Sequence, residues 1–259
     1  MRPMQGAELF RVSVGEDRPV VCAAHPATAY DEGTATLLAD MTDANVVCVN
    51  PGGGTLEAMV DELEATRDAL KLPPWVFWGM SGGGFLALLY AQRHPEGVSA
   101  IVVESACLCF RERLADPTCV LSPHFPQWRA ILGDRVEASA HREPSSAADA
   151  SWEYVVGLGE VFRRPDGAPL LVSPLPIDER MRAAMPELWR FDARSFVDSL
   201  RVRSLVIGGS ADPVVPFARV RALKERLVGS ELVEVEGGGH VPTASRHASV
   251  RAAARAFLA

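Results

Sequence analysis

The sequence predicts an α/β protein built on a mostly parallel sheet. Short apolar, β-branched runs alternate with helical patterns over the first 105 residues, which is typical of consecutive βαβ units. The same alternation resumes near residue 200. A glycine-rich stretch with one serine, "FWGMSGGG" (77–84), falls between a strand pattern and a helix pattern. Together these observations predict one sheet flanked by helices.

Seven strands and five helices are expected. The expected strands cover residues 7–14, 19–24, 45–50, 74–78, 98–104, 203–209 and 231–236. The expected helices lie near residues 33–40, 55–71, 82–93, 216–228 and 244–258. In the second of these helices, Leu56 is followed by apolar residues at the i+3, i+4 and i+7 positions. Such a stripe indicates a helix face that packs on a sheet.

Residues 107–199 interrupt the alternation. This segment holds prolines, helical fragments and the tryptophans Trp128, Trp152 and Trp189, with no convincing core strand. We therefore expect a core made of residues 1–106 and 200–259, with residues 107–199 inserted as a helical cap. Because the insertion leaves the sheet at the carboxyl end of a strand, it should place an apolar roof over a site at that edge.

Composition restricts the partners and the compartment. The chain has 33 acidic and 26 basic residues, a net charge of −7 and no basic run, so nucleic acid and membrane are not expected partners. It shows no signal-peptide pattern and no apolar run near the ~20 residues of a membrane span. Five cysteines without a CxxC pair indicate free thiols in a reducing compartment. We expect a cytoplasmic protein with a small-molecule substrate and no metal or cofactor, and the sequence leaves a homo-oligomer open.

The turn at residues 79–83 indicates nucleophilic chemistry. Gly79-Met80-Ser81-Gly82-Gly83 matches G-x-S-x-G, in which a serine occupies a tight strand-to-helix turn. Glycines on either side allow strand and helix to cross where a Cβ would clash. The strand before the motif and the helix after it make the match more specific than the pentapeptide alone. Ser81 is the candidate nucleophile, and a purely structural glycine turn is the alternative.

A serine nucleophile needs a base to take its proton and an acid to orient that base. Asp212 in "LVIGGSADPVVP" follows a late strand, and His240 in "VEGGGHVP" follows the last one. This is the chain order Ser…Asp…His. Glu104, at the end of the expected strand 98–104, is a rival acid, and a turn-forming role for Asp212 in "SADP" is the alternative.

These residues make the chain resemble the α/β-hydrolases, over roughly residues 19–105 and 201–258. Residues 59–98, "MVDELEATRDALKLPPWVFWGMSGGGFLALLYAQRHPEGV", are similar to the elbow region of proline-iminopeptidase-like hydrolases, which share the pattern "LALxYAQxHPE". The resemblance implies an α/β-hydrolase fold with an inserted helical cap. It assigns Ser81, Asp212 and His240 as nucleophile, acid and base of a metal-independent serine hydrolase.

Two turns depart from this family. Its His-Gly oxyanion motif appears here as "AAHPATA", with Pro26 in place of glycine. Because proline has no N–H, the expected oxyanion donors are the backbone amides of Ala27 and Gly82. The family's Asp-Arg-Gly-x-Gly-x-Ser turn appears as "NPGGGT" (50–55), which lacks the G-K-[ST] ending of a nucleotide-binding loop.

The expected reaction is cleavage of a carboxylic ester, or of an amide, in a small and partly apolar substrate through an acyl-enzyme. An ester is the default because its leaving group departs more easily. One alternative is a proline-iminopeptidase-like aminopeptidase, since Trp152-Glu153 is similar to a Trp-Glu pair whose glutamate binds the substrate's amino group in that family. Another is a catalytically weak, ligand-binding homologue. The expected substrate-binding residues are Trp152, Glu153 and Trp189.

Overall fold

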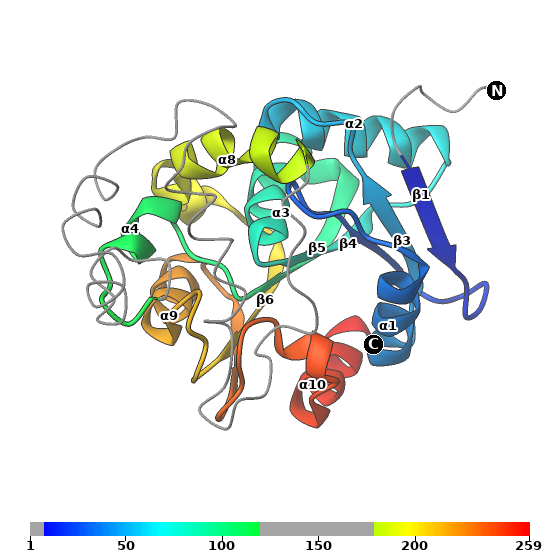
Figure 1. Ribbon diagram of the computed structural model, residues 1–259. Helices are drawn as coiled ribbons and strands as arrows, with labels where there is room; N and C mark the ends of the chain where they lie inside the picture. The colour runs from blue at the N-terminus through cyan, green and yellow to red at the C-terminus, as the bar shows by residue number, and fades with distance from the viewer. Residues whose placement is uncertain (1–7, 120–178) are drawn as a thin grey trace.

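A computed structural model describes residues 8–119 and 179–259 of the chain, and a single sheet organises them (Figure 1). Its strands lie in the order β1-β3-β2-β4-β5-β6-β7. They are β1 (Glu8–Val12), β2 (Val20–Ala23), β3 (Asn45–Asn50), β4 (Trp75–Met80), β5 (Val98–Glu104), β6 (Arg203–Gly209) and β7 (Glu231–Val235). Only β1 is antiparallel to its neighbour, so the predicted mostly parallel sheet is confirmed.

The helices of the described residues are α1 (Glu32–Thr42), α2 (Leu56–Ala69), α3 (Gly82–Arg93), α4 (Phe110–Leu114), α8 (Glu179–Arg190), α9 (Phe217–Arg226) and α10 (Ala248–Leu258). Five of them, α1, α2, α3, α9 and α10, correspond to the predicted helices, whereas α4 and α8 lie in the segment expected to hold only helical fragments. Four short 3-10 turns join them: η1 (Pro95–Gly97), η2 (Ala193–Ser195), η3 (Val197–Ser199) and η4 (Pro242–Ser245). The last helix begins at Ala248 rather than at residue 244, because Arg246 takes a left-handed conformation with φ 53° and separates η4 from α10.

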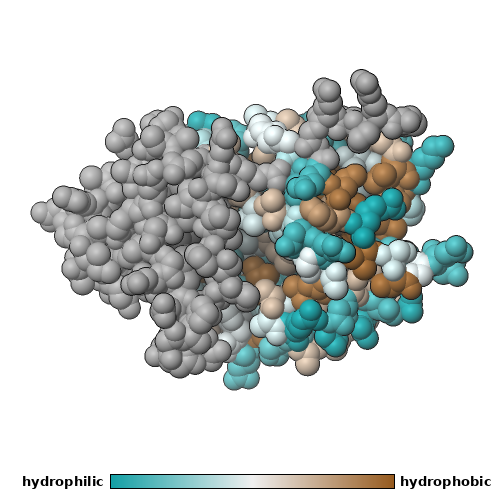
Figure 2. Space-filling model, turned by 45° about the vertical axis from the view of Figure 1, so that its right-hand side comes forward, coloured by the Kyte–Doolittle hydropathy of each residue, from teal (hydrophilic) through white to brown (hydrophobic). Residues whose placement is uncertain are grey.

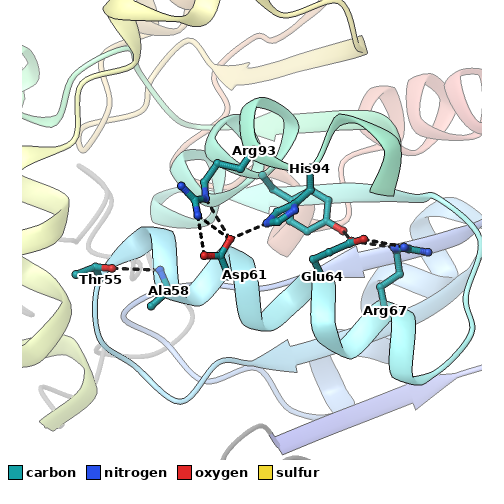
Figure 3. Close-up of polar contacts among 8 residues, drawn as sticks. Thr55, Ala58, Asp61, Glu64, Arg67, Arg93 and His94 are labelled. Carbon is teal, nitrogen blue, oxygen red and sulfur yellow. Dashed lines mark hydrogen bonds and ion pairs between the residues drawn. The ribbon is translucent and has the colours of Figure 1, made fainter.

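Side-chain caps explain where two helices begin. The Asp31 carboxylate accepts the Thr34 N–H at 2.8 Å at the start of α1. The Thr55 hydroxyl accepts the Ala58 N–H at 3.1 Å at the start of α2 (Figure 3). Each bond satisfies one of the N–H groups that a helix leaves without an internal acceptor. The two caps therefore fix the starts of the helices that follow β2 and β3.

Two apolar layers cover the two faces of the sheet. One layer contains the buried side chains of α2, α3 and α9, and it includes the predicted stripe that begins at Leu56. The other layer contains the buried side chains of α1 and α10, which lie side by side in Figure 1. Strand β4 between them is buried along its whole length. Burial on both faces is the usual condition of parallel strands and explains why this strand reads as a continuous apolar run.

A row of polar contacts fixes α3 against α2 (Figure 3). Asp61 of α2 accepts hydrogen bonds from Arg93 at 2.7 Å and meets the Nε2 of His94 at 2.8 Å. Glu64 pairs with Arg67 at 2.7 Å and also contacts the Tyr90 hydroxyl. These partners lower the pKa of both carboxyl groups. The contacts hold the far end of the helix that begins at the serine turn.

The described parts of the segment expected to form a cap are α4, α8 and the turns that follow α8. The Trp189 ring of α8 lies 6.0 Å from the Phe110 ring of α4, centroid to centroid. Phe191 stacks on Phe85 of α3 at 4.4 Å. Trp128, Trp152 and Glu153 lie outside the described residues, so the division into core and cap stays a prediction.

The surface and the cysteines bear on the expectations drawn from the composition. Figure 2 shows hydrophobic residues interspersed with hydrophilic ones on the face it presents. None of the described helices is long and apolar enough to cross a membrane. All five cysteines are buried and none forms a disulfide. Burial raises the pKa of Cys48 to about 12 and that of Cys22 well above its ordinary value, which favours the protonated thiol at both positions.

Candidate active site

Ser81 occupies the turn between β4 and α3 in a conformation that L-residues rarely adopt, with φ 53° and ψ −118°. Such a backbone persists only where the surroundings hold it. The Ser81 N–H donates to the Glu104 carbonyl at 2.8 Å, and the Ser81 carbonyl accepts the Gly84 N–H at 2.9 Å. The turn therefore presents the Ser81 side chain at the carboxyl edge of the sheet.

Two glycines permit this turn. A Cβ on Gly79 would lie 2.3 Å from the Gly83 carbonyl oxygen, and one on Gly83 would lie 2.4 Å from the Ala24 carbonyl oxygen. Both contacts involve backbone atoms rather than the ends of flexible side chains. The predicted reason for the glycines in "FWGMSGGG", a crossing of strand and helix too close for a side chain, agrees with this geometry.

The three residues predicted from their order along the chain meet at this edge. The Nε2 of His240 lies 2.9 Å from the Ser81 Oγ. The Nδ1 of the same ring lies 2.8 Å from the Asp212 Oδ2. The side chains of His240 and Asp212 are 7% and 0% exposed. Ser81 follows β4, Asp212 follows β6 and His240 follows β7, so strands far apart in sequence bring them together.

The Asp212 carboxylate is fixed on both of its oxygens. Its Oδ1 accepts the N–H groups of Val214 at 2.8 Å and Val215 at 2.9 Å, while its Oδ2 faces His240. A carboxylate held in this way accepts the Nδ1–H of the imidazole and leaves Nε2 as the proton acceptor. Serine, histidine and aspartate thus form a connected hydrogen-bond chain that can move a proton away from Ser81.

Glu104, the rival acid, is engaged elsewhere. Its Oε2 accepts from the Trp78 indole at 3.0 Å and from the Thr243 hydroxyl at 2.7 Å, and its Oε1 accepts the Thr243 N–H at 2.7 Å. The acid that contacts the His240 ring is Asp212, three residues beyond the end of β6.

The loop after β2 lies directly over the serine turn. The Nδ1 of His25 accepts the N–H of Ala27 at 3.0 Å and that of Thr28 at 2.8 Å. An Nδ1 that accepts two N–H groups carries no proton, so the hydrogen of this neutral ring is on Nε2. The predicted role of the Ala27 amide as an oxyanion donor stays a prediction, and it requires the bond to His25 to be exchanged for one to the substrate.

Gly82 begins α3, and the His25 ring lies beside it. The first N–H groups of a helix have no acceptor within the helix and favour negative charge. A Cβ on Gly82 would lie 2.8 Å from the Nε2 of His25 and 3.4 Å from the Cγ of Pro26. The glycine therefore gives the imidazole room to approach the amide next to the nucleophile.

Of the three predicted substrate-binding residues, the structure describes only Trp189. Trp152 and Glu153 lie outside the described residues. Trp189 is half-buried, contacts the Phe110 ring and packs against the core. The approach of the His25 ring to Gly82 was not predicted from the sequence. A histidine two residues before Ala27, in a motif whose glycine is replaced by Pro26, is the signal that pointed to this loop.

Metal ligands do not gather in the described part of the chain. Among residues 8–119 and 179–259, no group of three or more His, Cys, Asp or Glu side chains is placed to hold a metal ion. The chemistry available at this edge is that of a hydroxyl, an imidazole, a carboxylate and backbone N–H groups. That set suits acyl transfer, in which a hydroxyl attacks a carbonyl carbon.

Comparison with known proteins places the fold among the α/β-hydrolases. A family model described as "alpha/beta hydrolase fold" matches residues 17–137, and one described as "TAP-like protein" matches residues 185–259. A solved α/β-fold hydrolase from Bacillus anthracis superposes with a TM-score of 0.72 at 19% identity, covering 97% of this chain and 95% of that one.

Two relatives carry the names of hydrolases. A pimeloyl-[acyl-carrier protein] methyl ester esterase from Aromatoleum aromaticum is 29% identical over 199 residues, which are 74% of this chain and 78% of that protein. A protein named as a carbamate hydrolase from a Caulobacter species is 27% identical over 206 residues, which are 79% of this chain and 72% of that protein. Both names describe hydrolysis at a carbonyl carbon that carries a heteroatom leaving group.

Proposed function

This chain belongs to the α/β-hydrolase superfamily, and from that premise we propose that it is a serine hydrolase of carboxylic esters. One observation carries the proposal: His240 bridges the Ser81 Oγ at 2.9 Å and the Asp212 Oδ2 at 2.8 Å. A serine hydroxyl is a weak nucleophile until a base takes its proton, and this contact supplies the base. The fold alone would not justify the assignment, because the same fold hosts many activities.

The proposed reaction has two halves. The Ser81 Oγ bonds to the ester carbonyl carbon while its proton passes to the Nε2 of His240. The tetrahedral intermediate collapses when the C–O bond to the alcohol breaks, and the departing oxygen takes that proton. Water then attacks the acyl-enzyme and gives a proton to Nε2, and the Ser81 Oγ leaves with it as the free acid forms. Asp212 stays ionised throughout and stabilises the imidazolium.

Two N–H groups beside the nucleophile are the proposed donors to the developing oxyanion. The Gly82 amide lies at the start of α3 next to the nucleophile and is the first. The second proposed donor is the Nε2–H of His25, because its Nδ1 is occupied by the Ala27 and Thr28 amides and its Nε2 lies against Gly82. In this arrangement an imidazole replaces the backbone donor that the sequence analysis expects at Ala27.

An ester is the proposed bond class. Its alkoxide leaves more readily than an amine does, so it demands less from an oxyanion loop altered by Pro26. The methyl ester esterase relative supports the same choice. An amide substrate with a free amino group is the second candidate, and the Trp152-Glu153 pair favours it. A homologue that binds a ligand without turnover is a third, which the connected hydrogen bonds of Ser81 and His240 disfavour.

Labelling with a fluorophosphonate probe tests the proposal. The probe phosphonylates an activated serine, and we expect peptide mapping to find the adduct on Ser81 at an approximately 1:1 stoichiometry. The activity on p-nitrophenyl esters, measured over increasing acyl length, should fall in proportion to the fraction of protein labelled. An unlabelled wild-type protein that turns over none of these esters would support the ligand-binding alternative.

A further inference from the structure

The buried carboxylate of Glu104 has no role in the proposed reaction, yet it lies among the residues that carry it out. Its exposed fraction is 0%. A buried carboxylate is costly unless its oxygens accept hydrogen bonds, and here both do. The Trp78 indole and the Thr243 amide can only donate, and they reach different oxygens of the group. The site is therefore built for an ionised carboxylate and not for a carboxamide.

Two of the three donors to this carboxylate belong to the segment that carries His240. Thr243, which donates both its N–H and its hydroxyl to Glu104, comes three residues after His240. Ser105 directly follows Glu104 at the end of β5, and its hydroxyl accepts the Val241 N–H at 3.1 Å. Two consecutive residues thus hold the backbone immediately after the imidazole.

The held segment is strained. Val241 has φ 55°, which a β-branched residue rarely adopts, and Ser105 has φ 52°. A backbone of this kind relaxes unless its surroundings over-determine it. The bonds from Val241 to Ser105 and from Thr243 to Glu104 supply that restraint on both sides of Pro242.

The backbone of the same two residues reaches the rest of the site. The Glu104 carbonyl accepts the Ser81 N–H at 2.8 Å, and the Ser105 N–H donates to the Ile207 carbonyl of β6 at 2.8 Å. Strand β6 leads to Asp212. Residues 104 and 105 therefore connect the nucleophile turn, the acid strand and the histidine segment through direct hydrogen bonds.

We propose that Glu104 is a positioning residue for the reaction: its carboxylate clamps the segment after His240 so that Nε2 faces the Ser81 Oγ, and its charge supplements that of Asp212 behind the imidazolium. This inference rests on the proposed serine mechanism. Among the described residues, the titratable groups coupled to Glu104 are His240, from the segment after β7, and Tyr30, from the loop after β2. Burial is the largest influence and raises the pKa of Glu104 above its ordinary value, and the bonds from Thr243 and Trp78 and the charge of His240 offset only part of that rise.

The sign of the effect on pH dependence follows from the charge. A negative group near an imidazole favours the imidazolium and so raises the pKa of the histidine. The acid limb of kcat/KM reports that pKa in the free enzyme. Removing the charge while keeping the shape, as in Glu104→Gln, should move the acid limb to lower pH. A role confined to packing would leave the limb where it is.

The test compares Glu104→Gln and Glu104→Asp with the wild type on a p-nitrophenyl ester, with rates expressed per active site titrated by the fluorophosphonate. For Glu104→Gln we expect kcat to fall about 10- to 100-fold with KM little changed, the size expected when a catalytic group is displaced by a fraction of an ångström to 1 Å. Its acid limb should move to lower pH. Glu104→Asp keeps the charge but shortens the reach, so kcat should fall while the limb stays close to that of the wild type.

Glu64→Gln is the matched control. The Glu64 carboxylate also accepts a hydrogen bond, from the Tyr90 hydroxyl, and pairs with Arg67, but it lies at the contact between α2 and α3, away from Ser81 (Figure 3). It should lower the melting temperature and leave kcat and the acid limb unchanged.

If Glu104→Gln does not fold, Thr243→Val removes one bond to the same carboxylate and should lower kcat several-fold without moving the limb. Wild-type kcat per titrated site in Glu104→Gln with an unmoved limb would overturn the positioning role. An inactive, unlabelled wild type would instead overturn the serine mechanism.

Discussion

His240 and Asp212 meet through a single defined contact: the imidazole Nδ1 lies 2.8 Å from the carboxylate Oδ2, while the Oδ1 is held by two backbone N–H groups. This division of the two oxygens predicts the outcome of Asp212→Asn. The asparagine must keep its carbonyl on the backbone donors of Val214 and Val215, so its NH₂ group faces His240. The ring then accepts at Nδ1 and carries its proton on Nε2, where it is unable to accept the Ser81 proton. We expect kcat on p-nitrophenyl esters to fall about 10³- to 10⁴-fold with the fold retained.

Asp212→Glu separates geometry from charge in the same position. The longer side chain keeps the negative charge but displaces the carboxylate relative to the backbone donors, so a smaller loss is expected. If Asp212→Asn has the same kcat as the wild type, Asp212 is only a turn former and not the catalytic acid.

Replacing Ser81 should separate catalysis from stability. The φ of 53° that presents the hydroxyl is available to glycine without strain. Ser81→Gly and Ser81→Ala should both lose fluorophosphonate labelling and about 10⁴-fold in kcat. Relief of backbone strain, less the entropy glycine loses on folding, should make Ser81→Gly more stable than Ser81→Ala by about 1 kcal/mol. That difference corresponds to a melting temperature higher by about 2–4 °C.

Calorimetry of the two variants checks this prediction. A lower melting temperature for Ser81→Gly than for Ser81→Ala would show that the turn is not strained, and near-wild-type turnover in either variant would show that Ser81 is not the nucleophile.

The fold could be predicted largely because each element has a local signal. The strands over 45–50, 98–104 and 203–209 and the helix over 82–93 match the prediction at both ends. Continuous apolar runs and glycine turns define them without reference to tertiary contacts. The start of α10 was wrong by four residues because the left-handed Arg246 depends on the contacts of η4, which no local pattern reveals.

The candidate site also has residues that the sequence predicts and residues whose role only the structure reveals. Ser81, Asp212 and His240 could be ordered along the chain because each follows a strand whose carboxyl end reaches the same edge of the sheet. Glu104 was seen only as a rival acid, since its bonds to Thr243 and Trp78 join residues far apart in sequence. Side-chain partners of that kind are set by packing and have no sequence period.

The proposed second oxyanion donor gives a prediction on His25. An asparagine at this position can still accept the Ala27 and Thr28 N–H groups, as Asx turns do, but it is too short to donate beside Gly82. If the His25 Nε2–H stabilises the oxyanion, His25→Asn should lower kcat about 10²- to 10³-fold with little change in KM. The rates are measured on p-nitrophenyl esters beside His247→Asn, which alters an exposed histidine at the start of α10.

The alternative donor predicts a different result for His25. If the Ala27 N–H were the donor, His25→Asn would leave kcat unchanged, because the asparagine still accepts that N–H in place of the imidazole. A His25→Asn variant with kcat at or above the wild-type value would therefore assign the role to Ala27.

The last prediction concerns which bond is cleaved, and it depends on the acidic side chain that follows Trp152. If Glu153 binds a substrate's free α-amino group, as the resemblance to proline-iminopeptidase-like enzymes implies, Glu153→Gln should weaken kcat/KM for an N-terminal prolyl p-nitroanilide. The expected loss is about 1.5–3 kcal/mol, or roughly 10- to 150-fold, because a charge-assisted hydrogen bond to the ammonium is replaced by a neutral one. Hydrolysis of p-nitrophenyl esters, which carry no amino group, should stay near the wild-type rate. Glu160→Gln, which alters another acid of the same segment, is the matched control. An equal loss on both substrates would indicate damaged packing instead of amino-group binding, and a wild-type protein without any aminopeptidase turnover would leave the ester as the substrate class.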